Sequence, residues 1–377
     1  MVASALGCVL MSGERAAGLD GSGVALDAAL IKARARELGF DLCGIAKVRA
    51  LERASFDRWY ANDWDARLAY MRARIEERLD PRLVLSGAES VIVVAASYGP
   101  SRDETLSTAP SAGEMLSVAR YAQGRDYHNV LLKRVRKLAA WMREMGARVY
   151  AEVDTGAVAE KAWAMESGLG WIGKNGLLIH EKFGSWLLLG ALVTDLVLDA
   201  DARHPDRCGE CSACIPACPT NAIQEGRLVD SNRCLAFHTI ETRAPIPREL
   251  ATRAGGRVFG CDACQDACPW NRRAREGTLV ELRARPRQKV LALEDVLAFT
   301  DASVRADYVG TPLMRAQRDG LVRAALAVCK RPLTGRVREL ATTLLEDSCA
   351  AIREEAQRAL EDDAATTGSP PHAATKS

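Results

Sequence analysis

Two cysteine runs between residues 208 and 268 constrain the fold of this 377-residue chain more than any other feature. The first reads C-x2-C-x2-C-x3-C-P, the spacing of bacterial 4Fe–4S ferredoxins, and the second repeats the C-x2-C-x3-C-P ending with its leading cysteine displaced upstream. In such two-cluster modules the fourth cysteine of each run ligates the other cluster. The runs therefore predict one 4Fe–4S cluster on Cys208, Cys211, Cys214 and Cys268, and a second on Cys234, Cys261, Cys264 and Cys218.

Zinc and disulfides are the alternatives to iron–sulfur binding. Structural zinc usually takes two ligands from one short segment and two from a distant one, whereas the first run places four cysteines between residues 208 and 218. Disulfides are disfavoured because no secretory signal is recognisable. The cysteines outside the runs are scattered singly and are predicted to be small buried hydrophobic residues: Cys8, Cys43, Cys329 and Cys349.

Composition limits the remaining possibilities. The chain is 48% hydrophobic and 27% charged, which is typical of a globular protein, and its length permits two or three domains. A net charge of +2 restricts any nucleic-acid surface to a local patch. Apolar runs are too short for a membrane span, and no twin-arginine pair opens the chain. We expect a cytoplasmic protein without membrane association, translated from Met1 or from Met11.

Hydrophobic periodicity divides the chain into five parts. Residues 1–23 are expected to be a flexible extension, and strand-like and helix-like segments alternate over 24–204, which predicts a layered α/β or α+β domain. Within it, Leu51 to Arg78 reads as helical, and Ser90 to Tyr98 reads as a buried strand. The cluster module follows at 205–271. Residues 272–361 are nearly all helical in period, which predicts a short HEAT-like domain, and 362–377 are expected to be disordered.

A basic stretch opens the C-terminal part. It carries seven basic residues against Glu276 and Glu281. It is either a solvated linker or a surface that contacts nucleic-acid phosphates. The basic residues are Arg272, Arg273, Arg275, Arg283, Arg285, Arg287 and Lys289.

Asp154 is the candidate for acid chemistry. It follows the predicted strand Arg148 to Val153 and precedes Thr155-Gly156, and the carboxyl ends of strands are where layered α/β sheets place ligand sites. An aspartate in this position is also an ordinary helix N-cap. The local pattern alone favours the cap.

Several rare strings in order resemble the epoxyqueuosine reductase family. They are LGFDLCGIA from Leu38, AYM from Ala69, LDPR from Leu79, YAQGRDYH from Tyr121, VDTG from Val153, GLGWIGKN from Gly168, CLAFHTIE from Cys234, FGCDACQDACPWN from Phe259 and GTPLMR from Gly310. The resemblance implies a cobalamin-dependent iron–sulfur enzyme that reduces the epoxide of epoxyqueuosine, at the anticodon wobble position of tRNA, to queuosine. It also implies an α+β fold, with a cobalamin-binding core like that of reductive dehalogenases, a ferredoxin-like module with two clusters and a C-terminal HEAT-like domain.

The resemblance also assigns residues. Asp154 matches the family's proton donor, and we expect burial to raise its pKa. The turn predicted to lie against the corrin comprises Gly168, Gly170, Gly173, Lys174 and Asn175. Tyr121, Asp126, Tyr127 and His128 match a motif near the same pocket. No D-x-H-x-x-G motif is present, so the family pattern implies base-off cobalamin.

Two departures from the family pattern concern the turn and the RNA-binding helix. Ala157 stands where the family usually has proline, which we expect to loosen the turn after Asp154. The family's RNA-x-x-AL helix reads RAALAV from Arg323 to Val328, which weakens any detailed expectation about tRNA docking.

Two rival functions remain open. A reductive dehalogenase of small molecules would leave the C-terminal helices and the basic stretch unexplained. A plain electron carrier would not need the domain ahead of the cluster module. We therefore expect a monomeric enzyme that takes electrons from a low-potential donor.

Overall fold

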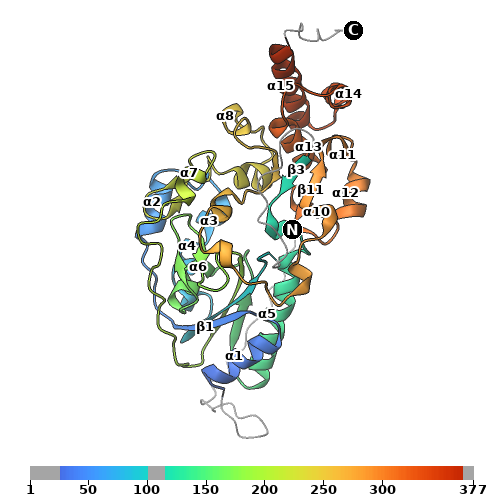
Figure 1. The fold of residues 1–377 in the computed structure, drawn as a ribbon. Coiled ribbons are helices and arrows are strands. Elements are labelled where there is room, and N and C mark those ends of the chain that lie inside the picture. Colours follow the sequence, from blue (N-terminus) through green and yellow to red (C-terminus); the bar gives the residue numbers. More distant parts are fainter. Residues whose placement is uncertain (1–25, 101–114, 368–377) are drawn as a thin grey trace, which may run out of the picture.

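A computed structural model describes residues 26–100 and 115–367 of the chain (Figure 1). The N-terminal part is built on a four-stranded antiparallel sheet of order β1-β2-β7-β4. These strands are β1 (Leu42–Lys47), β2 (Ser90–Ser97), β7 (Leu187–Thr194) and β4 (Val149–Glu152). The long central pair of strands, β2 and β7, fixes the register of the sheet: Ser90 lies opposite Thr194, and Ser97 lies opposite Leu187.

Helices cover both faces of this sheet. Successive side chains of a strand point to opposite faces, and along β2 Ile92 and Val94 pack with α1 (Ala28–Glu37) and α5 (Tyr127–Glu144). Val91 and Val93 pack on the other side with α6 (Glu160–Glu166) and the hairpin of β5 (Trp171–Ile172) and β6 (Leu178–Ile179). All eight residues of β2 are buried, which confirms the predicted buried strand.

The predicted helix from Leu51 to Arg78 is wrong as a single element. The structure divides it into α2 (Ala54–Ala61), α3 (Ala69–Ala73) and α4 (Ile75–Leu79). Between α2 and α3, Asp63, Ala66 and Arg67 have φ angles of 53°, 50° and 54°, which lie in the left-handed region and end an α-helix.

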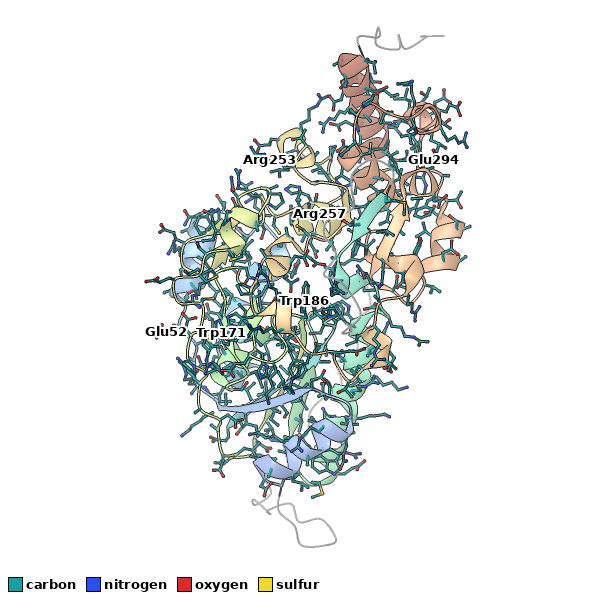
Figure 2. All side chains as sticks on the ribbon, viewed as in Figure 1. Glu52, Trp171, Trp186, Arg253, Arg257 and Glu294 are labelled. Atoms are coloured by element: carbon teal, nitrogen blue, oxygen red, sulfur yellow. The ribbon has the colours of Figure 1, made fainter. Side chains whose placement is uncertain are left out.

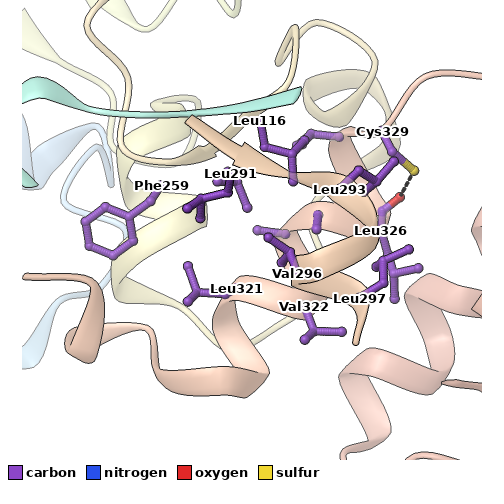
Figure 3. Close-up of a cluster of buried hydrophobic side chains, with 14 of the residues drawn as sticks. Leu116, Phe259, Leu291, Leu293, Val296, Leu297, Leu321, Val322, Leu326 and Cys329 are labelled. Atoms are coloured by element: carbon purple, nitrogen blue, oxygen red, sulfur yellow. Dashed lines mark hydrogen bonds between the residues drawn. The ribbon is translucent and has the colours of Figure 1, made fainter. Parts of the chain in front are cut away.

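A second sheet joins segments that are far apart in sequence. β3 (Met115–Val118) lies between β10 (Arg257–Phe259), to which it is parallel, and β11 (Val290–Ala292), to which it is antiparallel. β11 is thus a strand within residues 272–361, which were predicted to be nearly all helical. Figure 3 shows Leu116 and Leu291 from two of these strands among the side chains of the core beneath them, with Val296 from α11 (Leu293–Leu297).

The cluster module is made of short elements. They are α7 (Cys214–Ala217), the hairpin of β8 (Ile223–Gln224) and β9 (Leu228–Val229), a π-helical turn (Phe237–Glu241), α8 (Arg248–Ala251) and α9 (Ala263–Asp266). Single π-helical turns are rare and occur often at functional sites.

The C-terminal part consists of packed helices. α12 (Asp301–Tyr308), α13 (Gln317–Val328), α14 (Gly335–Thr343) and α15 (Ala350–Thr367) follow α11, with α13 lying against both α11 and α15. α15 continues to Thr367, so the segment 362–367 is helical rather than disordered. The extension 1–23 with Cys8, and most of the predicted tail, lie outside the described residues. A HEAT-like repeat stays a prediction.

Two further expectations can be compared with the described residues. Cys329 is buried, while Cys43 and Cys349 are partly buried, and none of the three forms a disulfide. Within residues 26–100 and 115–367, no helix is both long and apolar enough to span a bilayer.

Candidate active site and cluster-binding cysteines

A cavity of about 400 Å³ lies beside Asp154. Residues from three distant parts of the chain line it. The N-terminal domain contributes Asp154, the π-helical turn of the cluster module contributes Ile240 and Glu241, and the C-terminal part contributes Pro312 and Arg315. The remaining lining residues are Tyr70, Tyr121, Tyr127, His128 and Thr155.

The Asp154 carboxylate meets two side chains from the start of α5. The Tyr127 hydroxyl donates to Asp154 Oδ2 at 2.9 Å, and His128 Nε2 lies 2.7 Å from the same oxygen. His128 Nδ1 lies 2.9 Å from Asp126 Oδ1, and the Tyr127 and His128 rings stack with centroids 4.1 Å apart. The imidazole is therefore held between two carboxylates, and one of them faces the cavity.

The helix-cap interpretation of Asp154 does not describe its contacts. α6 begins at Glu160, and its N-cap residue Ala159 has no side-chain cap hydrogen bond. The backbone N–H groups of Ala157 and Val158 donate instead to the Glu152 carboxylate. The side chain of Asp154 is thus directed toward the start of α5.

The electrostatics of this group differ from our expectation. Burial acts to raise the pKa of Asp154, but the hydrogen bond and charge of His128 and the Tyr127 hydroxyl outweigh it and lower that pKa. Burial acts to lower the pKa of His128, while its bonds to Asp126 and Asp154 raise it to about 9. At neutral pH the imidazole therefore holds a proton at the edge of the cavity, so the expected raised pKa of Asp154 is not found.

The cysteines of the two runs lie in two interleaved groups. Burial raises the pKa of the Cys214 thiol, and the neighbouring thiols that add to this effect belong to Cys268, Cys208 and Cys211. Around Cys264, whose thiol pKa is raised mainly by burial, the contributing thiols are those of Cys261, Cys234 and Cys218. The last cysteine of each run thus lies with the other run, as the predicted ligand sets require.

The surroundings of these thiols suit a cluster. Ala222 N–H donates to Cys218 Sγ at 3.2 Å. Burial raises the thiol pKa of Cys234 and Cys261, and hydrogen bonds from backbone N–H groups partly oppose that rise. Such bonds favour the thiolate that iron binds. Among the described residues, no three His, Cys, Asp or Glu side chains form a group that could hold a metal ion.

The two groups differ in their distance from the cavity. Cys211 is exposed, whereas Gly260, the residue before Cys261, approaches both Ile240 and Tyr121 of the cavity wall closely enough that an added Cβ would lie 3.7 Å from each. The first group thus reaches solvent through Cys211, and the second lies on the cavity side.

The residues expected to lie against a corrin have mixed surroundings. A Cβ at Gly168 or Gly170 would lie 2.4 Å from Ala202 O or 2.1 Å from Ile179 O, so both glycines are needed for packing within the protein. Lys174 Nζ donates to Gly209 O. Asn175 is 4% exposed and its Nδ2 has no partner among the described residues. In the segment 168–175, Asn175 Nδ2 and Trp171 Nε1 (Figure 2) are buried donors without a partner among the described residues, while Tyr121 and His128 line the cavity.

Sequence reasoning did not single out three residues of the cavity. Tyr70, Glu241 and Arg315 line it, and Arg315 pairs with Glu241 at 2.8 Å. All three lie within strings that carried the family resemblance: AYM, CLAFHTIE and GTPLMR. The signal was therefore present, but nothing in the local pattern showed that these strings meet in space.

The fold and the site define an iron–sulfur oxidoreductase of the α+β class. Residues 207–271 match the model of a 4Fe-4S double cluster binding domain, and residues 78–155 match "Epoxyqueuosine reductase QueG, DUF1730". The chain is 42% identical to the epoxyqueuosine reductase of Gloeobacter violaceus over 79% of its own length and 94% of that relative. It is 42% identical to a Synechococcus epoxyqueuosine reductase over 76% and 89%. The chain belongs to the epoxyqueuosine reductase family.

Solved structures agree with this assignment. A crystal structure of epoxyqueuosine reductase with an epoxyqueuosine-modified tRNA-Tyr stem loop superposes with a TM-score of 0.80, at 26% identity and 88% coverage of each chain. A selenomethionine-labelled epoxyqueuosine reductase gives a TM-score of 0.78 at 25% identity, covering 88% of this chain and 89% of that one. The α+β fold is therefore that of the family over most of the chain.

Proposed function

We propose that this chain reduces the epoxide of epoxyqueuosine in tRNA to queuosine. The reaction takes two electrons and two protons, removes the epoxide oxygen as water and leaves an alkene in the ring. The observation that carries the proposal is the cavity at Asp154. It is lined by His128 and Asp154, which hold a proton between them, and by residues of the cluster module. The chain that contains it is a member of this family. The stem-loop ligand of the related crystal structure supports tRNA as the substrate.

The chain's own residues supply the first of the two protons, and the second comes from solvent water. His128 and Asp154 share one proton between Nε2 and Oδ2, 2.7 Å apart. Asp154 is 44% exposed to the cavity side and passes this proton to the epoxide oxygen, while Asp126 holds the imidazole in place through Nδ1. A positioned acid of this kind typically contributes about a hundredfold to ten-thousandfold in rate.

The electron-transferring groups are held by side chains already described. Cys208, Cys211, Cys214 and Cys268 hold the outer cluster, and Cys218, Cys234, Cys261 and Cys264 hold the inner one. We assign Tyr121, His128 and Asn175 to base-off cobalamin, and the family pattern adds Gly168, Gly170, Gly173 and Lys174. When bound, cobalamin supplies a cobalt centre whose reduced form delivers electrons to carbon.

Partners and location follow from the same proposal. Electrons arrive from a low-potential donor at the first group of cysteines, in which Cys211 is exposed. The C-terminal helices form a HEAT-like domain that docks the tRNA, and the protein acts as a cytoplasmic monomer. Reconstituted protein should convert epoxyqueuosine in a tRNA anticodon stem loop to queuosine, measured by nucleoside mass spectrometry. Conversion of an unrelated epoxide, together with no conversion of the stem loop, would overturn this assignment.

The basic stretch should contribute to tRNA affinity. Arg283 and Arg285 are exposed, and Arg283 pairs with Glu276 at 2.9 Å. Replacing both with Ser should weaken tRNA binding and flatten the dependence of log affinity on log salt by roughly one to two units, because fewer counterions are released. Cobalamin uptake should be unchanged.

A matched control for this pair lies on α1. Arg34 pairs with Glu37 at 2.8 Å and Arg36 is exposed, so replacing both with Ser removes the same number of positive charges from a helix of the N-terminal part. We expect the control to keep the wild-type salt slope. An unaltered slope in the Arg283 and Arg285 variant would return the stretch to the role of a solvated linker.

The raised pKa of His128 can be measured directly. In holoprotein labelled on histidine, the His128 imidazole signal should titrate near pH 9, because Asp126 and Asp154 stabilise the charged form. Asp126→Asn should lower that pKa toward the ordinary 6.5, since it removes one of the two charges. The chain has five histidines, and His128→Asn identifies the signal. A midpoint near 6.5 in wild type would contradict the proposed proton-holding pair.

A further inference from the structure

The turn that presents Asp154 is held from both sides by glutamates. Glu152 ends β4 ahead of the turn, and Glu160 begins α6 after it. Neither side chain lines the cavity. Both accept hydrogen bonds from backbone N–H groups of the turn, which leads from Asp154 to Val158.

Glu152 binds the far end of the turn. Its Oε2 accepts from Ala157 N–H at 2.7 Å and its Oε1 from Val158 N–H at 2.6 Å. The Tyr150 hydroxyl also donates to Oε2, at 2.6 Å, and the Glu152 residue is only 6% exposed. A Cβ at Gly156 would lie 1.6 Å from Oε2. Gly156 is therefore required so that the carboxylate can reach the turn.

Ala157 gives this chain a contact that a proline could not make. Proline has no backbone N–H, whereas the Ala157 N–H donates to Glu152 and the residue is fully buried. The expected loosening of the turn is thus offset by a hydrogen bond. In this chain the hydrogen bond from Ala157 N–H to the Glu152 carboxylate restrains the turn at the position where a proline ring would restrain it.

Glu160 binds the near end, at Asp154 itself. The Asp154 N–H donates to Glu160 Oε1 at 2.8 Å. Asp154 has a φ of 61°, in the left-handed region that is unfavourable for residues other than glycine. Such a conformation persists only where surrounding contacts hold it. This bond restrains the backbone of the strained residue, while Tyr127 and His128 contact its side chain.

We infer that Glu160 and Glu152 are positioning residues, which together hold Asp154 in its left-handed conformation so that its carboxylate faces Tyr127 and His128. The inference rests on the proposed role of Asp154 as proton donor. Glu160 acts on the acid through the backbone, and Glu152 fixes the turn that follows. Misplacement of a reacting group by about 1 Å can cost roughly a hundredfold in rate.

The acceptor at position 160 does not need a charge. Burial raises the pKa of Glu160 to about 8, so the carboxyl is mostly neutral at pH 7 and resembles an amide. Glu160→Gln keeps Oε1 as acceptor and should retain wild-type behaviour. Glu160→Ala removes the acceptor. The Glu152 carboxylate binds two backbone N–H groups, and Glu152→Gln keeps only one acceptor oxygen for them. This variant should therefore lose the restraint on the turn only in part.

Hydrogen exchange of the peptide spanning residues 153–159 tests the inference in holoprotein, beside steady-state kinetics with the epoxyqueuosine stem loop. Glu160→Ala should speed exchange of this peptide about tenfold or more and lower kcat by a similar factor, with KM for the stem loop unchanged. Glu160→Asp, one methylene shorter, should open the turn likewise if the Ala variant does not fold. Glu166→Ala, at the other end of α6, is the matched control and should leave this peptide unchanged.

The outcomes separate this inference from the proposed function. Unchanged exchange in both Glu160→Ala and Glu160→Asp overturns the positioning role whatever the turnover. An equal rise in hydrogen exchange in Glu160→Gln and Glu160→Ala would show that the acceptor oxygen at position 160 does not hold the turn. Wild-type turnover in Asp154→Asn overturns the acid role but leaves the exchange result valid.

Discussion

Asp154→Asn should fold, keep both clusters and bind cobalamin, yet turn over epoxyqueuosine tRNA roughly a hundredfold or more slowly. The amide fills the same volume, and its oxygen still accepts the Tyr127 hydroxyl that donates to Oδ2 in the wild type. An amide cannot pass a proton to the epoxide oxygen. It also removes one of the charges that raise the pKa of His128. Single-turnover kinetics with the modified stem loop measure the effect.

Asp126→Asn is the matched control for this change. Asp126 caps α5 by accepting from His128 N–H at 3.0 Å, and Asn caps a helix as well as Asp. It contacts the imidazole but not the cavity, so we expect a smaller loss of rate. Turnover of Asp154→Asn near the wild-type rate would leave Asp154 without a catalytic role.

Cys218→Ala should destroy the cluster of the other run and spare its own sequence neighbours. The thiols around Cys264 include that of Cys218, whereas those around Cys214 do not. We expect the iron content to fall by half, the remaining signal to be that of the outer cluster, and turnover to be lost. Electron paramagnetic resonance of the reduced protein and iron analysis measure this.

Cys214→Ala is the complementary variant. It should remove the outer cluster and leave the inner one, because the Cys214 thiol lies with Cys208, Cys211 and Cys268. Loss of the outer cluster in Cys218→Ala would show that each run binds its own cluster, and the interleaved assignment would then be wrong.

Elements with strong local patterns could be predicted from sequence. The β-branched run of β2 and the 3.6-residue period of α5 specify their structure locally. The break between α2 and α3 could not be predicted, because Asp63, Ala66 and Arg67 adopt left-handed conformations without glycine. Short strands such as β3 and β11 were missed because each is stable only through pairing with a distant segment.

The same distinction applies to the site. Ligand spacing predicted the cluster cysteines, because iron–sulfur chemistry restricts spacing directly. His128 and Asp154 were named from the family strings, yet no local pattern shows that they meet, and their mutual effect on pKa depends on that contact. Glu152 and Glu160 were not singled out at all. Their role appears only once the conformation of the turn is known.

The sheet of order β10-β3-β11 restricts how this protein can be cut and recombined. Its central strand comes from the N-terminal part, and its neighbours come from the cluster module and the C-terminal part. A fragment that holds the cysteines alone would leave β10 without its partner and expose apolar surface such as Phe259. Exchange of cluster modules between relatives should therefore succeed only when β3 is transferred with them, although β3 precedes Cys208 by about ninety residues.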